Sequence, residues 1–134
     1  MPVVRTNSID LYYEVQGAGT PLVLLAGLGY PGWQWHRMAP LLAQRCQVFT
    51  LDNRGVGRSD KPAGPYTASL LAADTVGLLD ALGIEQAAIM GHSMGGFIAQ
   101  ALALEYPQRV SKLILASTAS VSYTHLTLPT SDLV

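Results

Sequence analysis

Hydrophobic and polar positions follow two different periods along the chain. Between residues 9 and 16 they alternate, with Leu11, Tyr13 and Val15 on one side, and this period of two is typical of a β-strand. Short apolar runs without alternation are typical of strands that are buried on both faces. The pattern predicts six strands, at residues 2–6, 9–16, 21–25, 47–51, 86–90 and 112–116, the last of them buried.

Three segments between the later strands have the hydrophobic spacing of helices, at residues 35–44, 68–82 and 94–106. Thr67 is placed to cap the second of these helices, and Gly83 is placed to end it. The apolar residues of this helix fall within one arc, while Asp74, Gly77 and Asp80 fall outside it. The third helix is apolar almost all round, which predicts an interior position.

The expected elements follow the order β, β, β, α, β, α, β, α, β. Strands that alternate with helices predict an α/β fold, a mostly parallel sheet with helices on both faces. The first two strands have no helix between them, so they predict an antiparallel pair at the start of the fold. Because no repeat or linker interrupts residues 1–119, we expect them to belong to one domain.

Composition narrows the classes of function. The 134 residues are 49% hydrophobic and 13% charged, with a formal net charge of -1, as in a chain with a buried core. No segment concentrates lysine and arginine, so nucleic acid is not an expected partner. The apolar runs are far shorter than the roughly 18 residues of a membrane span, and the chain does not open like a signal peptide. We expect a soluble cytoplasmic protein that does not bind membranes.

Cysteine and histidine offer no metal or redox site. Cys46 is the single cysteine, and we expect a buried, inert thiol there. The three histidines, His36, His92 and His125, include no pair at the spacing of metal ligands. We therefore expect no metal ion.

A candidate nucleophile lies between an expected strand and an expected helix. Residues 91–96 read GHSMGG, and a GxSxG sequence in this context is a nucleophile elbow. The turn is so tight that the residues two before and two after the serine cannot carry side chains, which accounts for Gly91 and Gly95. We predict Ser93 as the catalytic nucleophile. The alternative is a glycine turn with a structural role only.

Two backbone amides are candidates for an oxyanion hole. The N–H of Met94 opens the helix after the elbow, where the helix dipole also favours negative charge. The loop after the strand at residues 21–25 can offer the N–H of Leu28, because Gly27 and Gly29 permit close approach of the backbone. The alternative for these glycines is a simple turn from strand to helix, and both interpretations can hold together.

A third motif joins the elbow and the oxyanion loop, and with these three motifs the chain resembles the α/β-hydrolase fold superfamily over residues 1 to about 119. Residues 52–60, DNRGVGRSD, are similar to the DxRGxGxS loop of these enzymes. The resemblance is to small hydrolases such as 3-oxoadipate enol-lactonases, cofactor-free haloperoxidase/esterases and C–C bond hydrolases. Ser93 argues against haloalkane dehalogenases and most epoxide hydrolases, whose nucleophile is aspartate. Many relatives have His-Gly where this chain has Ala26-Gly27, which affects the rigidity of the loop and not its backbone donor.

The roles of two further groups stay open at this stage. We interpret residues 52–60 as a mainly structural loop, and the alternative is a substrate contact from Arg54 or Arg58. Trp33 and Trp35 are candidates to line an acyl pocket near the oxyanion loop, and the alternative is ordinary packing.

The partners that the serine needs are missing. In this fold a carboxylate and then a histidine follow the nucleophile. His36 precedes Ser93, His92 adjoins it on a turn where neighbouring side chains diverge, and downstream His125 and Asp132 stand in the wrong order. We expect the triad acid and histidine to be absent from this chain.

The last residues do not continue the pattern of the fold. Residues 122–130 resemble the translation of a transposase-type sequencing adapter. We expect residues 120–134 to be a non-native tail, on a fold truncated after about the sixth strand. A genuine short protein with an unusual tail is the alternative.

The sequence thus predicts part of a serine hydrolase that cleaves a small ester, lactone or related carbonyl compound through an acyl-enzyme, without a cofactor. A perhydrolase, haloperoxidase or C–C bond hydrolase on the same fold is one alternative. A non-catalytic ligand-binding relative is another. Without its triad partners, the chain as given is expected to be inactive.

Overall fold

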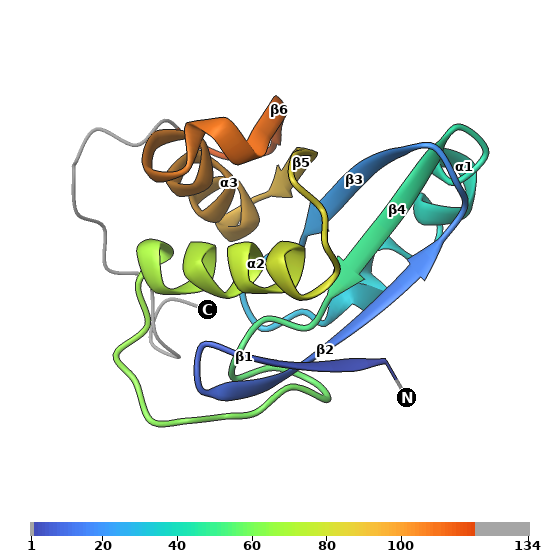
Figure 1. The fold of residues 1–134 in the computed structure, drawn as a ribbon. Helices are drawn as coiled ribbons and strands as arrows, with labels where there is room; N and C mark the ends of the chain where they lie inside the picture. The colour runs from blue at the N-terminus through green and yellow to red at the C-terminus, as the bar shows by residue number, and fades with distance from the viewer. Residues whose placement is uncertain (1, 120–134) are drawn as a thin grey trace.

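A computed structural model describes residues 2–119 of the chain, and the expected tail at residues 120–134 lies outside them. Six strands form one sheet in the order β1-β2-β4-β3-β5-β6 (Figure 1). They are β1 (Val3–Thr6), β2 (Ile9–Gln16), β3 (Thr20–Leu25), β4 (Cys46–Leu51), β5 (Ala87–His92) and β6 (Val110–Ala116). β2 pairs antiparallel with β1 and with β4, whereas β4, β3, β5 and β6 run parallel. The predicted mostly parallel sheet with an antiparallel start is confirmed.

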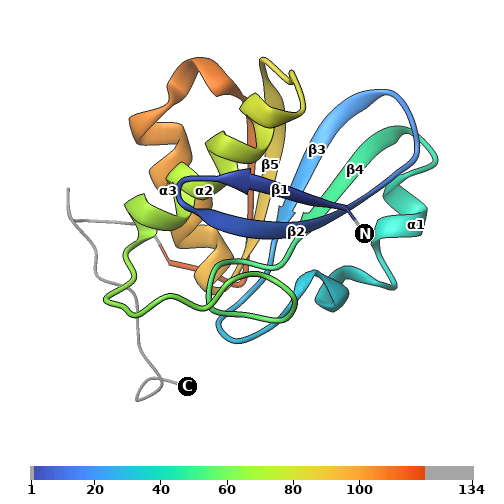
Figure 2. The same ribbon diagram turned by 60° about the horizontal axis from the view of Figure 1, so that its bottom comes forward.

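Helices cover both faces of the sheet, as predicted. On one face lie α2 (Ala68–Ala81) and α3 (Met94–Glu105), side by side. The short 3-10 helix η1 (Gly32–Trp35) and α1 (Ala39–Leu42) lie on the other face, and a second 3-10 turn, η2 (Pro107–Arg109), precedes β6. Figure 2 shows the β1–β2 hairpin with α2 and α3 to one side of it and α1 to the other.

The prediction of one helix over residues 35–44 was wrong. The segment forms η1 and a four-residue α1, separated by residues 36–38. Pro40 lies in the first turn of α1. Because proline has no N–H to donate and its ring blocks the carbonyl one turn earlier, a helix begins at such a residue more easily than it passes through it.

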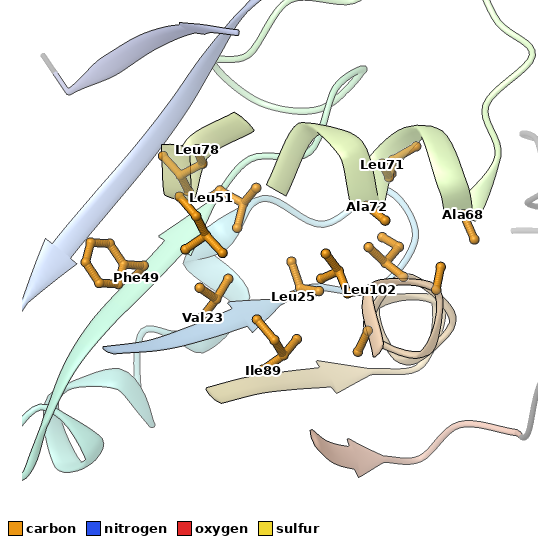
Figure 3. Close-up of a cluster of buried hydrophobic side chains, with 14 of the residues drawn as sticks. Val23, Leu25, Phe49, Leu51, Ala68, Leu71, Ala72, Leu78, Ile89 and Leu102 are labelled. Atoms are coloured by element: carbon orange, nitrogen blue, oxygen red, sulfur yellow. The ribbon is translucent and has the colours of Figure 1, made fainter. Parts of the chain in front are cut away.

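The hydrophobic core lies between the sheet and the α2–α3 pair. Side chains from β3, β4 and β5 point toward both helices, and Figure 3 shows Val23, Leu25 and Ile89 facing Leu102 across this layer. These four side chains are completely buried. A smaller cluster on the opposite face packs Leu22, Leu24 and Val48 of the sheet against Trp35 and Ala39. Successive side chains of a strand point to opposite faces of the sheet, so β3 and β4 contribute to both clusters.

Helix α2 begins and ends where the sequence predicts. The Thr67 hydroxyl oxygen accepts a hydrogen bond from the backbone N–H of Leu70 at 3.0 Å, which satisfies an amide that the helix leaves unpaired. Gly83 follows the helix with a φ of 70°, a conformation that favours glycine. The residues outside the apolar arc are not all exposed, however: Asp74 is fully buried, and Gly77 lies against Thr6 of β1. The β1–β2 hairpin covers this side of the helix.

Strand β6 is an exposed edge and not the buried strand that its composition predicts. Leu113, Ile114 and Leu115 are 40%, 41% and 42% exposed. β6 pairs only with β5 among the described strands, so its outer edge has no partner within residues 2–119. No helix within the same residues is long and apolar enough to cross a lipid bilayer.

We expect the isolated chain to self-associate through β6, because an apolar edge strand offers both hydrogen bonds and hydrophobic surface to a second chain. Sedimentation velocity over roughly 1 to 100 µM, a range in which such edges aggregate, should show species larger than the monomer. The double substitution Leu113→Lys and Leu115→Lys should reduce this association. Leu41→Lys adds charge at an exposed leucine of α1 and should not. A monomeric wild-type chain over the whole range would contradict the prediction.

Candidate active site

Ser93 lies on the turn that joins β5 to α3. Its backbone has a φ of 56° and a ψ of -118°, a strained conformation that costs about 1–3 kcal/mol in a residue with a side chain. The surrounding chain holds it there: Ser93 N donates to the Ala116 carbonyl at 3.0 Å, and the Ser93 carbonyl accepts from Gly96 N and from the Thr118 hydroxyl. Ser93 is exposed, while Met94 after it is buried. Ser93 is therefore accessible to solvent at the turn.

Glycine is required on both sides of Ser93 for steric reasons. A Cβ at Gly91 would overlap the carbonyl oxygen of Gly95, and a Cβ at Gly95 would overlap the carbonyl oxygen of Leu25. These clashes are with backbone atoms, which cannot move aside without moving the strand or the helix. The spacing of glycines in GxSxG thus follows from the close packing of β5, α3 and the end of β3.

The loop after β3 lies directly beside the serine. A Cβ built on Gly27 would lie 3.6 Å from the Ser93 Cβ and 3.7 Å from the His92 carbonyl oxygen. Leu28, whose N–H is the second predicted oxyanion donor, is the next residue and is half-buried. Met94 is the first residue of α3, next to Ser93. The fold therefore brings the two loops with the predicted donors to the candidate nucleophile.

The described histidines do not face Ser93. The His92 ring points to the η1 side of the sheet, where Nδ1 lies 3.2 Å from Gln34 Nε2 and the ring meets Trp35 edge to face. His36 stacks on Trp33, with 3.8 Å between the ring centroids. His125 and Asp132 lie outside the described residues. Neither the His92 nor the His36 imidazole is hydrogen-bonded to Ser93.

Asp52 at the end of β4 ties the DNRGVGRSD loop to η1. Its carboxylate accepts from Gly32 N at 2.7 Å with one oxygen and from Arg58 N at 2.9 Å with the other. A Cβ at Gly57 would overlap this carboxylate, so the position has room only for glycine. The Ser59 hydroxyl donates to the Asp52 carbonyl oxygen. These contacts give the loop a structural role.

The Arg54 guanidinium forms a buried ion pair with Asp74 of α2. Nε and one terminal nitrogen donate to the two carboxylate oxygens at 2.6 and 2.8 Å. The hydrogen bond to Asp74 raises the pKa of Arg54 above its already high ordinary value, against the opposing effect of burial. Because Asp74 and Arg54 are both buried, Arg54 is engaged in holding α2 and is not placed to contact a substrate. The position of Asp74 in the apolar helix pattern did not reveal this pair.

Arg58 lies on the surface, beside a cavity at the other end of the same loop. Its guanidinium lies 4.8 Å above the Tyr12 ring and donates to the Tyr12 hydroxyl at 2.8 Å. The Tyr12 hydroxyl in turn donates to Glu14, and this hydrogen bond raises the pKa of Tyr12 above its ordinary 10.0. These three side chains line a cavity of about 460 Å³ together with Trp33 and Trp35.

The cavity does not support the predicted acyl pocket. Neither Ser93 nor Leu28 lines it. Trp33 is 69% exposed and Trp35 is 6% exposed, so the first borders open surface and the second mainly packs against the sheet. Cys46 is a half-buried free thiol. Within the described part of the chain, the structure shows no group of three metal-ligating side chains.

Comparisons with known proteins place this geometry in a family. The model of the alpha/beta hydrolase fold family matches residues 20–132, so the chain belongs to the α/β-hydrolase fold family. It is similar to the 2-hydroxymuconate semialdehyde hydrolase of Pseudomonas sp. strain CF600, with 42% identity over 125 residues, which cover 90% of this chain and 42% of that protein. The chain spans less than half the length of the curated relatives it matches.

Two solved structures agree in fold and sequence. The first is Est816, described as an N-acyl homoserine lactone degrading enzyme, with a TM-score of 0.84 and 39% identity over 89% of this chain and 46% of that one. The second is the enol-lactonase from Burkholderia xenovorans LB400, with a TM-score of 0.85 and 34% identity over 88% of this chain and 47% of that one. The predicted resemblance to enol-lactonase-type hydrolases is confirmed, and the homologues support a hydrolase.

Proposed function

We propose that the whole protein is a cytoplasmic serine hydrolase that cleaves a small ester, lactone or related carbonyl compound without a cofactor. The observation that carries this proposal is the exposed Ser93 hydroxyl on a strained strand-to-helix turn, directly beside the glycine loop after β3. Such a turn is costly to fold, and strain of this kind is concentrated at functional sites.

The proposed reaction proceeds through an acyl-enzyme. Ser93 Oγ attacks the carbonyl carbon of the substrate, and its proton passes to a general base that lies outside the described residues. The negative charge that develops on the carbonyl oxygen is stabilised by the N–H groups of Met94 and Leu28, at the positive end of the α3 dipole. The bond to the leaving group then breaks, and water hydrolyses the ester to Ser93.

Relatives support the choice of substrate class. Two similar structures are named for a lactone-degrading enzyme and an enol-lactonase, and a lactone is a cyclic ester. One relative is named for 2-hydroxymuconate semialdehyde, a carbonyl compound that is not an ester. This favours, as a second candidate, hydrolysis of a C–C bond next to a carbonyl group with the same serine.

A serine-directed fluorophosphonate probe tests the proposal in the whole protein. We expect one covalent phosphonyl adduct, which peptide mapping by mass spectrometry assigns to Ser93. Ser93→Ala should abolish the adduct, whereas the matched control Ser69→Ala, at the surface end of α2, should keep it. An adduct elsewhere would contradict the assignment of Ser93 as the nucleophile, and no adduct on a folded protein would favour a non-catalytic ligand-binding role.

A further inference from the structure

Gln34 of η1 bridges the candidate oxyanion loop and the residue before the nucleophile. Its Oε1 accepts a hydrogen bond from Gly27 N at 2.8 Å, and its Nε2 lies 3.2 Å from Nδ1 of His92. Gly27 is buried, and Gln34 and His92 are half-buried. The short 3-10 helix η1 thus connects the loop after β3 with the end of β5, the strand that leads to Ser93.

Only one assignment of protons satisfies both contacts. A backbone N–H can only donate, so the Gln34 atom facing Gly27 is the carbonyl oxygen and the atom facing His92 is the NH₂ group. Because that NH₂ group also only donates, His92 Nδ1 must accept, and the neutral imidazole carries its proton on Nε2. Gly27 N therefore donates to Gln34, and Gln34 donates to His92.

These hydrogen bonds help to fix the direction of the Leu28 N–H. Gly27 N is held by Gln34, and the Gly27 carbonyl oxygen accepts from Tyr30 N at 3.2 Å. In a trans peptide the N–H points opposite to the C=O, so the Leu28 N–H points away from the Tyr30 turn. Glycine has no Cβ to restrict rotation of the backbone. Without these two hydrogen bonds, the peptides on either side of Gly27 would therefore rotate more freely than peptides beside any other residue type.

Gln34 is itself held on both sides. Gly32, two residues earlier, donates from its backbone to the buried Asp52 carboxylate at 2.7 Å. Trp35, which follows Gln34, is buried and meets the His92 ring edge to face, with 6.4 Å between the centroids. The Asp52 loop, η1 and the end of β5 therefore all support the position of the Gln34 amide.

We propose that Gln34 and His92 are positioning residues that set the orientation of the Leu28 N–H in the oxyanion hole. The inference rests on the proposed function, because Leu28 matters only if an oxyanion forms at Ser93. Neither side chain touches the substrate in this proposal. Both act through the backbone of Gly27.

Kinetics of the whole protein test this positioning role. Removing one oxyanion donor lowers kcat by roughly 10²- to 10³-fold, so misplacing it through Gln34→Ala or Gln34→Met should lower kcat by about 10- to 100-fold with little change in KM. His92→Ala should have a similar effect, and His92→Asn, whose Oδ1 can accept from Gln34, should recover most of the loss. His36→Ala removes an exposed imidazole near the same helix and should leave kcat unchanged.

A spectroscopic measurement checks the chain of hydrogen bonds without using activity. In ¹⁵N-labelled protein near neutral pH, His92 should show a protonated Nε2 and an unprotonated Nδ1, and Gln34→Ala should change the Nδ1 resonance. A proton on Nδ1 would overturn the proposal. If Ser93→Ala abolishes hydrolysis but folded Gln34 and His92 variants keep full kcat, the positioning role fails alone. If hydrolysis survives Ser93→Ala, both the proposed function and this inference fail.

Discussion

Replacing Ser93 with alanine is expected to lower kcat of the whole protein by about 10⁴- to 10⁶-fold, the range seen when the nucleophile of a serine hydrolase is removed. The exposed Ser93 hydroxyl lies beside the loop that carries the predicted Leu28 donor, and the substitution removes only its oxygen atom. Alanine keeps the same Cβ in the same strained turn, so the melting temperature should not fall. Steady-state kinetics on a lactone or ester substrate and a thermal melt measure the two effects.

Ser59→Ala is a matched control with the opposite profile. The Ser59 hydroxyl oxygen accepts from Tyr12 N at 2.8 Å and its proton bonds the Asp52 carbonyl, so its loss should destabilise the fold by about 1–3 kcal/mol. It lies in the structural loop after β4, and kcat should therefore stay close to that of the wild type. A large loss of kcat in Ser59→Ala, or a small one in Ser93→Ala, would contradict the assignment of the nucleophile.

Local patterns predict most of the fold because the strands and the two long helices have clear periods. Residues 9–16 alternate and form β2 over the same residues. Thr67 and Gly83 mark both ends of α2, since capping depends on the residues beside the helix. The segment at residues 35–44 is different. It has the composition of a helix, but Pro40 and contacts with β4 and β5 decide its shape.

Burial by distant elements is the part that periodicity does not show. The pattern put Asp74 outside the apolar arc of α2, yet the β1–β2 hairpin folds over it and Arg54 meets it from a loop 20 residues earlier. The opposite error occurs at β6, where an apolar composition predicts burial and the described residues leave Leu113 to Leu115 exposed. Both depend on which element packs next to a strand or helix.

The candidate site also has one part that the sequence predicts and one part that it does not. The elbow is readable in sequence because its glycines and serine are neighbours and the steric requirement is local. Gln34 could not be recognised, because a single glutamine in a short segment has no pattern, and its role depends on the loop after β3 and on His92. Contacts between elements create this part of the site.

Asp74→Ala is expected to destabilise the fold strongly, because Asp74 is fully buried. It would leave Arg54 without its carboxylate, and removing one partner of a buried ion pair costs about 3–5 kcal/mol. Asn7, whose side-chain amide donates to Asp74 at 2.7 Å, would lose its acceptor as well. Urea denaturation of the wild type and the variant measures the change in the free energy of unfolding.

The double variant Arg54→Met and Asp74→Leu tests whether the two buried charges themselves are needed for stability. Apolar residues of similar size remove both charges together, and among the described residues only Asn7 loses hydrogen-bond partners, so the double variant should recover much of the stability that Asp74→Ala loses. Hydrolysis by the double variant should persist, because the Arg54 guanidinium is buried against Asp74 of α2. A loss of kcat without a loss of stability would instead place Arg54 at the substrate, the alternative that its burial against Asp74 argues against.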